Sequence, residues 1–204
     1  MLSKDRILPV VALGMLAALG GAWLAQKFAP PTPVLRAATA LPTPRELHNF
    51  TLQDTTGAAF GLRDLARAPS LLFFGFTQCP DVCPTTLALL ARLRRAAKLP
   101  ALRVIMISVD PQRDSSAILR QYLAAFDVEF VGLTGSVQAV NALTQDVGVA
   151  LAQLPAASGG YSIDHSATVF LTDAQGRLKA VFTPPLDPEA MLSDLRALWP
   201  KLLK

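Results

Sequence analysis

The two cysteines of the chain, Cys79 and Cys83, lie between an apolar run and a helical pattern. Residues 70–76 form a nearly continuous apolar run with aromatic side chains, as in a central strand that is buried on both faces. A helical pattern follows over residues 85–98, and Pro84 suits the first turn of such a helix because its φ is preset and it lacks an N–H. The sequence therefore predicts a strand–loop–helix unit, with Cys79 in the loop and Cys83 at or near the helix N-cap.

The rest of the chain from Asn49 onward continues this alternation of strand and helix patterns. Strands are predicted at residues 49–53, 58–62, 103–109, 129–132, 167–172 and 178–183, and helices at 116–126, 136–146 and 188–198. The alternation implies parallel strands joined by crossover helices, and the hairpin near the C-terminus adds antiparallel strands. We expect an α/β domain with a central mixed β-sheet flanked by helices, and its cysteine pair at a strand-to-helix junction resembles the thioredoxin-like fold.

The N-terminal part contains a long apolar segment, residues 7–25, without a charged residue. As a helix it would be about 28 Å long, close to the hydrocarbon thickness of a bilayer. Lys4 and Arg6 precede it, and a short basic head before an apolar run favours an N-terminus in the cytoplasm. We predict an N-terminal signal anchor over residues 1–25 with one transmembrane helix; the alternative is a cleaved signal peptide, since residues 38–40 have the small-x-small form of a cleavage site.

A proline-rich stretch follows the apolar segment. The prolines are Pro30, Pro31, Pro33, Pro42 and Pro44. This composition favours extended, poorly packed chain, so residues 26–44 are predicted to be a tether and residues 45–204 the thioredoxin-like domain. We expect the protein to be held in the inner (cytoplasmic) membrane by its single helix. The thioredoxin-like domain would then lie in the periplasm, a compartment that oxidises thiols.

The charge distribution argues against a nucleic-acid partner. The net charge is +4, and the Lys and Arg residues are scattered along the chain. A basic stripe interleaved with aromatic side chains, the usual electrostatic footprint of a nucleic-acid-binding surface, is absent from the sequence.

The predicted position of Cys79 and Cys83 favours reactive thiols, because the positive end of a helix stabilises the thiolate. Two such thiols can close a disulfide, attack another disulfide or hold a soft metal ion. A purely structural disulfide is the weakest of these readings, since a loop this short gains little stabilisation from closure.

Of the two histidines, only His165 is predicted to take part in the chemistry. It precedes the strand at residues 167–172, and in a thioredoxin-like topology that position faces the cysteines, where thioredoxins place a cis-proline. His48 lies in a polar context and is assigned no role. Two thiolates and one imidazole suit copper or zinc, but structural zinc usually takes four ligands, whereas copper(I) accepts three and copper(II) can add an oxygen ligand.

Several carboxylates accompany these residues. Asp164 is expected to orient His165. Asp114 or Ser115 is expected to cap the following helix, and Asp110 to bond the backbone of its loop.

Three separated motifs together resemble the Sco/SenC family of copper-binding assembly proteins. They are Cys79-Pro80-Asp81-Val82-Cys83-Pro84, then Ser108-Val109-Asp110-Pro111-Gln112-Arg113-Asp114, then Asp164-His165-Ser166. The resemblance covers about residues 45–200. It implies copper bound by Cys79, Cys83 and His165, and a role in building the binuclear copper centre of cytochrome c oxidase, with the copper-receiving oxidase subunit as partner and another copper chaperone or a thiol reductase as further partners.

A second function class stays open beside the metallochaperone. Cys79 and Cys83 would also serve a membrane-anchored thiol–disulfide oxidoreductase that reduces the cysteines of a partner protein. A peroxiredoxin-like peroxidase is disfavoured because the Thr-x-x-Cys motif is missing. Gly159 and Gly160 suggest that the segment before His165 moves as metal enters.

Overall fold

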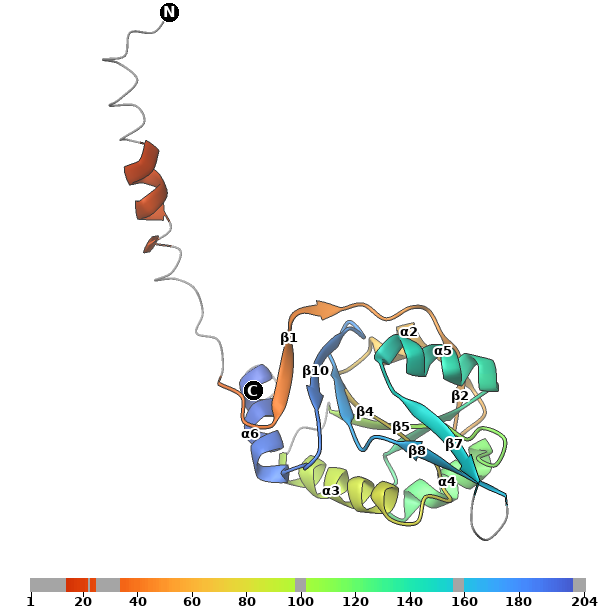
Figure 1. The fold of residues 1–204 in the computed structure, drawn as a ribbon. Helices are drawn as coiled ribbons and strands as arrows, with labels where there is room; N and C mark the ends of the chain where they lie inside the picture. Colours follow the sequence, from red (N-terminus) through yellow and green to blue (C-terminus); the bar gives the residue numbers. More distant parts are fainter. Residues whose placement is uncertain (1–13, 22, 25–33, 98–101, 156–159, 200–204) are drawn as a thin grey trace, which may run out of the picture. The chain divides into compact units, whose positions relative to one another are not determined.

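The computed structural model describes residues 14–21, 23–24, 34–97, 102–155 and 160–199 (Figure 1). The chain divides into two compact units, residues 1–34 and 35–204. In the first unit, residues 14–21 and 23–24 are helical. Among the described residues, none of the helices has both the length and the apolar character needed to span a membrane. Part of the predicted span, residues 7–13, 22 and 25, lies outside them.

The second unit is built on an eight-stranded mixed sheet with the order β1-β10-β9-β4-β5-β6-β2-β3. Its strands are β1 (Ala38–Arg45), β2 (Thr51–Asp54), β3 (Ala59–Gly61), β4 (Ser70–Gly75), β5 (Arg103–Ser108), β6 (Val131–Thr134), β9 (Val169–Thr172) and β10 (Leu178–Phe182). The three central strands β4, β5 and β6 are parallel, and the flanking strands pair antiparallel. The predicted α/β class with a central mixed sheet is confirmed.

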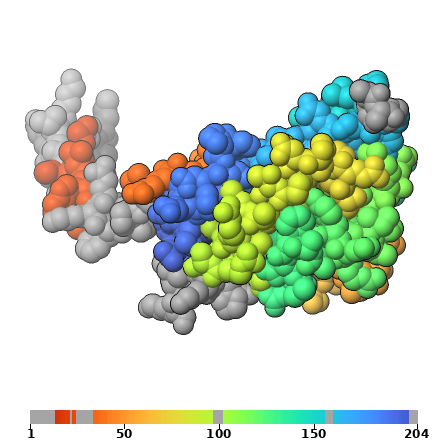
Figure 2. Space-filling view, turned by 90° about the horizontal axis from the view of Figure 1, so that it is seen from below, coloured from red at the N-terminus to blue at the C-terminus, as the bar shows by residue number. Residues whose placement is uncertain are grey.

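Helices cover both faces of this sheet. They are α2 (Leu62–Leu65), α3 (Val82–Ala97), α4 (Ser116–Ala124), α5 (Val137–Val147) and α6 (Pro188–Leu198). Helices α3, α4 and α6 share one apolar core with the sheet, and α2 and α5 contribute to a second core on the opposite face. Figure 2 shows the first of these faces, with α6 in blue beside α3 in yellow. Because successive side chains of β4 point to opposite faces, Phe73 enters the first core and Phe74 the second.

Strand β1 corrects the predicted boundary between tether and domain. Residues 38–44 were expected in the tether, but they form most of β1, which pairs antiparallel with β10. The prolines fit because β1 is an edge strand, and Pro42 and Pro44 fall where its register with β10 shifts. The buried carboxylate of Asp194 in α6 fixes the start of this strand.

A two-stranded hairpin outside the main sheet was also missed. Strand β7 (Leu151–Pro155) pairs antiparallel with β8 (Tyr161–His165) as a separate sheet. Residues 154–161 were expected to be irregular. Strand β7 has one polar side chain, Gln153, among apolar ones, so it lacks the polar–apolar alternation of a half-buried strand, and Pro155 also disfavours a strand; most of its side chains are exposed.

Other boundaries shift by a few residues. Strand β6 spans Val131–Thr134 in place of the predicted 129–132, and helix α3 begins at Val82 in place of residue 85. The helix Pro188–Leu198 with its cap Asp187 and the helix that follows the cap Ser136 are confirmed.

The topology brings three segments to one edge of the sheet. Strands β4 and β5 run parallel, with Gly75 opposite Ser108, so the loops that follow them emerge together. Strand β9 runs antiparallel to β4, with Val169 opposite Phe73, so the segment that precedes β9 meets the same edge. The cysteine loop, residues 110–114 and His165 are therefore neighbours.

Candidate metal centre

The cysteine loop joins the end of β4 to the first turn of α3. Cys79 is half-buried and Cys83 is fully buried, and both are free thiols. The backbone N–H of Cys83 donates to Cys79 Sγ at 3.4 Å. Because α3 begins at Val82, Cys83 lies inside the first turn of the helix, and the sulfur of Cys79 takes up one of the N–H groups that a helix start leaves unpaired.

Cys83 is held against the strand that precedes it. A Cβ atom added at Gly75 would lie 2.8 Å from Cys83 Sγ, so the close approach of strand and sulfur depends on a glycine at this position. Burial raises the pKa of the Cys83 thiol. This corrects the expectation that the helix start would favour a thiolate at both cysteines: at Cys83, the loss of solvent outweighs the helix dipole.

His165, at the end of β8, faces the buried cysteine. Its Nε2 lies 3.2 Å from Cys83 Sγ, and its Nδ1 lies 3.1 Å from the carbonyl oxygen of Ser166. An Nδ1–H that donates to this carbonyl leaves the lone pair of Nε2 toward the sulfur. The rings of Phe73 and Phe76 meet the imidazole edge-on, with centroids 6.0 and 5.9 Å away. Burial lowers the pKa of His165 and favours the neutral ring.

The ring is oriented by the Ser166 carbonyl. The predicted partner, Asp164, is exposed and contributes only its charge, which raises the pKa of His165 against the effect of burial. The remaining histidine, His48, contacts Asp146 through its Nδ1 at 2.8 Å.

The three donors form one cluster. The sulfurs of Cys79 and Cys83 and a ring nitrogen of His165 all lie within 4.8 Å of one another. A metal ion with bonds of about 2.0–2.3 Å holds three ligands in a plane roughly 3.5–4 Å apart. The donor set therefore fits a soft metal ion after a small closure, and the structure confirms that these three sequence-predicted residues come together.

A buried carboxylate holds the start of the cysteine loop. Asp114 Oδ2 accepts hydrogen bonds from the backbone N–H of Thr77 at 3.0 Å and from Ser108 Oγ at 2.7 Å, and Asp114 Oδ1 accepts one from Thr77 Oγ1 at 2.6 Å. Ser115 is the N-cap of α4, and its Oγ accepts from the N–H of Ile118. Of the two predicted caps, Ser115 is therefore confirmed and Asp114 is not, because the fully buried carboxylate of Asp114 binds the donors beside it.

The sequence reasoning also missed a network on the other side of the loop. Arg113 Nε donates to the carboxylate of Asp110, and Tyr161 OH donates to the same carboxylate at 2.8 Å. Arg113 Nη1 donates to Gln78 Oε1 at 3.0 Å. The Asp110 carboxylate therefore binds two side chains, and it is the Asp110 carbonyl oxygen that accepts from the loop backbone, from the N–H groups of Arg113 and Asp114. The signal in the sequence was the opposite charges of Asp110 and Arg113, three residues apart in the motif of residues 108–114.

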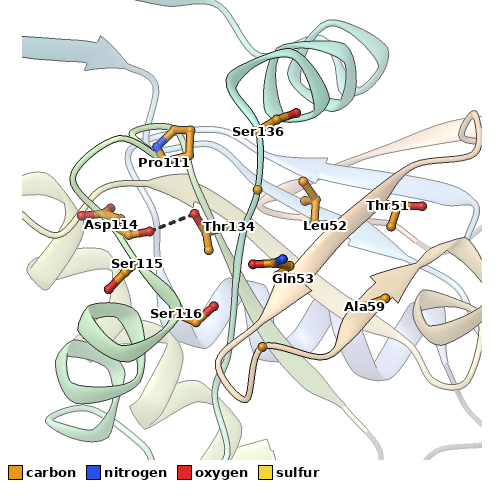
Figure 3. A pocket seen from close by; sticks show the side chains of 12 residues that line it. Thr51, Leu52, Gln53, Ala59, Pro111, Asp114, Ser115, Ser116, Thr134 and Ser136 are labelled. Carbon is orange, nitrogen blue, oxygen red and sulfur yellow. Dashed lines mark hydrogen bonds between the residues drawn. The ribbon is translucent and has the colours of Figure 1, made fainter.

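The hollows near these residues differ in their lining. One of about 280 Å³ opens over Cys79 and His165. A larger one, of about 570 Å³, lies between β2 and the starts of α4 and α5, and Figure 3 shows its polar wall, where Thr134 Oγ1 donates to the Asp114 carbonyl at 2.8 Å. Its lining holds neither cysteine nor histidine, so the donor chemistry assigns the site to the smaller hollow.

Comparison with known proteins gives one consistent family. The SCO1/SenC family model matches residues 38–200. A SCO2-like protein of Rickettsia felis is 32% identical over 152 residues, which cover 72% of this chain and 74% of that protein.

Solved structures of the same family superpose on this chain. The structure of Bradyrhizobium japonicum ScoI with copper bound has a TM-score of 0.67 and 36% identity, covering 74% of this chain and 97% of that one. Apo Sco1 from Thermus thermophilus has a TM-score of 0.71 and 35% identity, covering 83% and 99%. The range of the family model includes the strands that bring the three donors together.

Proposed function

Since the chain belongs to the SCO1/SenC family, we propose that it is a copper metallochaperone that binds copper through Cys79, Cys83 and His165. The observation that carries this proposal is the meeting of two sulfurs and one imidazole nitrogen within 4.8 Å. The solved ScoI of Bradyrhizobium japonicum, which contains copper, supports copper as the metal. Three soft donors are enough for copper(I), and copper(II) would add an oxygen ligand.

The side chains prepare the site for a metal in different ways. Buried Cys83 is a neutral thiol before binding, so its proton must leave to solvent as the sulfur becomes a ligand. His165 already offers an unprotonated nitrogen, because its other nitrogen donates to the Ser166 carbonyl. Half-buried Cys79 lines the opening of the hollow, where a metal ion can arrive or leave.

The recipient that we propose is the copper-receiving subunit of cytochrome c oxidase, whose binuclear copper centre the protein would help to assemble. The support is the family resemblance of the three motifs. Another copper chaperone or a thiol reductase would supply metal or electrons.

The location that we propose is the periplasmic face of the inner membrane, with residues 7–25 as the anchor. The support is the uncharged run itself. Extraction of cell membranes at alkaline pH should leave the full chain in the pellet and release a chain that begins at Leu35. Release of both chains alike would contradict the anchor.

A thiol–disulfide oxidoreductase is the second candidate, and one observation favours it. Cys79 is the more accessible cysteine, and its sulfur accepts an N–H at the start of α3, as an attacking thiol requires. Cys83, buried behind it, would then resolve the mixed disulfide.

Replacement of His165 separates the two candidates. The reduced full chain with His165→Ala should bind copper(I) about a hundredfold more weakly in competition with a chromophoric chelator, because one of three ligands is lost. Formation of the Cys79–Cys83 disulfide should be retained.

His48→Ala is the matched control and should bind copper(I) like the wild-type chain, since His48 is exposed and contacts Asp146. Unchanged affinity in His165→Ala would rule out the three-donor site. Reduction of a partner disulfide at the wild-type rate by His165→Ala would favour the oxidoreductase.

A further inference from the structure

Strand β8 has a donor at one end and an anchoring residue at the other. His165 ends the strand at the metal centre, and Tyr161 begins it. Between these ends, a hollow of about 160 Å³ separates part of the hairpin from residues 109–112 and the start of α5. Leu151 and Ile163 touch the core only as half-buried residues. The way Tyr161 is fastened therefore helps to set where β8 lies.

Arg113 and Asp110 together contact the ring, the carbonyl and the hydroxyl of Tyr161. The guanidinium carbon of Arg113 lies 4.0 Å from the centre of the Tyr161 ring, and Nη1 donates to the Tyr161 carbonyl at 3.1 Å. The hydroxyl of Tyr161 donates to Asp110 Oδ1 at 2.8 Å, and Asp110 is itself paired with Arg113 Nε. The ring, the hydroxyl and the backbone of Tyr161 are thus all held by two side chains of one loop.

The same guanidinium reaches the cysteine side of the metal centre. Its Nη1 donates to Gln78, the residue before Cys79, at 3.0 Å. Its carbon atom lies 5.8 Å from the centre of the Phe76 ring, and that ring also meets the imidazole of His165. Arg113 therefore contacts both segments whose separation decides whether one ion can touch all three donors.

We propose that Arg113 is a positioning residue of the metal centre: with Asp110 it fastens Tyr161 to the cysteine loop and so holds His165 within 4.8 Å of the two sulfurs, where one ion can reach all three donors. The inference rests on the proposed function, because it takes His165 to be a metal ligand. Arginine suits this task, since a planar fork can stack on a ring and donate in several directions at once, whereas the ammonium of lysine is a point charge.

The test uses the reduced full chain, copper(I) and a competing chelator. Arg113→Gln should lower the copper(I) affinity about ten- to hundredfold, the range found when an outer partner of a metal ligand is removed. Arg113→Lys should not restore the affinity, because it keeps the charge but loses the fork. Wild-type affinity in Arg113→Lys would overturn the proposal by showing that charge alone suffices.

A second measurement, hydrogen exchange, reports on strand β8 and needs no metal. In the copper-free protein, backbone amides of β8 should exchange hydrogen faster in Arg113→Gln than in the wild-type chain. The matched control is Arg103→Gln, which removes an arginine that donates to the carbonyls of Asp64, Leu65 and Ala68 at the other end of β5. The control should lower thermal stability and leave both the exchange of β8 and the copper affinity unchanged. Equal effects of the two variants on copper affinity would overturn the proposal.

A double-mutant cycle separates this proposal from the proposed function. If Arg113 acts through His165, Arg113→Gln should have little further effect on copper affinity in a His165→Ala background. Additive losses would overturn the positioning role and leave the three-donor site intact. Unchanged affinity in His165→Ala alone would instead overturn the proposed function, on which this inference rests.

Discussion

The three candidate metal donors come from two regions of the fold that differ in how firmly they are packed. Cys79 and Cys83 follow β4, a central strand whose six residues are all buried, and Cys83, in the first turn of α3, is buried against that strand. His165 ends a two-stranded hairpin outside the main sheet, with β7 largely exposed. The cysteine loop is further tied to Asp114, whereas the hairpin is held at Tyr161 by the loop of residues 110–114.

The difference assigns different tasks to the donors. The Cys83 sulfur is fully buried, and the sulfur of half-buried Cys79 accepts the Cys83 N–H, so we expect both to keep their place whether or not a metal is present. The imidazole belongs to a region with fewer buried contacts, and such regions open at a lower free-energy cost. A copper chaperone of the kind proposed above must both hold and release its metal, and we expect His165 to be the donor that leaves.

The largest effect is expected at the buried sulfur. Cys83→Ser should abolish stoichiometric copper(I) binding, because a hydroxyl is a poor ligand for this soft ion. The fold should persist, since the new hydroxyl lies beside His165 Nε2, which is 3.2 Å from the Cys83 sulfur and can accept its proton in a hydrogen bond. Metal analysis after gel filtration, together with a thermal melt, measures both. If Cys83→Ser retained one copper per chain, the buried cysteine would not be needed for metal binding, and the contrast between the cysteine loop and the hairpin would be wrong.

A smaller loss of copper affinity is expected from a substitution at Gly75, where β4 approaches the sulfur of Cys83. In Gly75→Ala the new Cβ would lie 2.8 Å from Cys83 Sγ and 2.9 Å from the Phe73 ring, so the sulfur must move. We expect copper(I) affinity to fall about tenfold, within the range for groups that position a ligand. Gly135→Ala is the matched control, since its Cβ would meet Leu52 at 2.8 Å, away from the donors. Both variants should lose stability, and equal affinities would show that Cys83 is not held by its strand.

The smallest effect on copper is expected at the start of β1. Asp194 accepts hydrogen bonds from the backbone N–H groups of Arg36, Ala37 and Ala38. Asp194→Asn should lower the free energy of unfolding by about 2 kcal/mol, because bonds to a buried charge are lost. Copper affinity should remain unchanged, since neither metal-bearing region contacts this carboxylate in the described part of the chain. Denaturant unfolding measures the loss of stability, and chelator competition on the same preparation measures the copper affinity. A tenfold loss of copper affinity would show that the start of β1 and the metal centre are coupled, which would contradict this prediction.

The parts of the fold that sequence predicts well are those with strong local signals. The apolar run that became β4, the cap Ser136 and the cap Asp187 each mark an element by their own chemistry. The order of these elements was enough to bring His165 to the cysteines, because β9 runs antiparallel to β4. The donor set of the candidate site was therefore predictable from topology and motif.

What sequence could not supply depends on contacts between distant segments. The proline-rich stretch reads as a tether, and only pairing with β10 turns part of it into an edge strand. The hairpin β7–β8 lies outside the main sheet, and Asp114 and Arg113 also bind Thr77 and Gln78, which lie more than thirty residues away in the chain. The neutral state of Cys83 follows from its burial under β4, which no local motif reveals.

The most direct test of the account is X-ray absorption at the copper edge on the copper(I)-loaded full chain. The account predicts one copper per chain with two sulfur ligands at about 2.2–2.3 Å and one nitrogen ligand at about 2.0 Å. In His165→Ala the nitrogen should disappear while the two sulfurs remain. A wild-type spectrum with sulfur ligands alone, or with more than two sulfurs per copper, would contradict a site that joins the two regions of one chain.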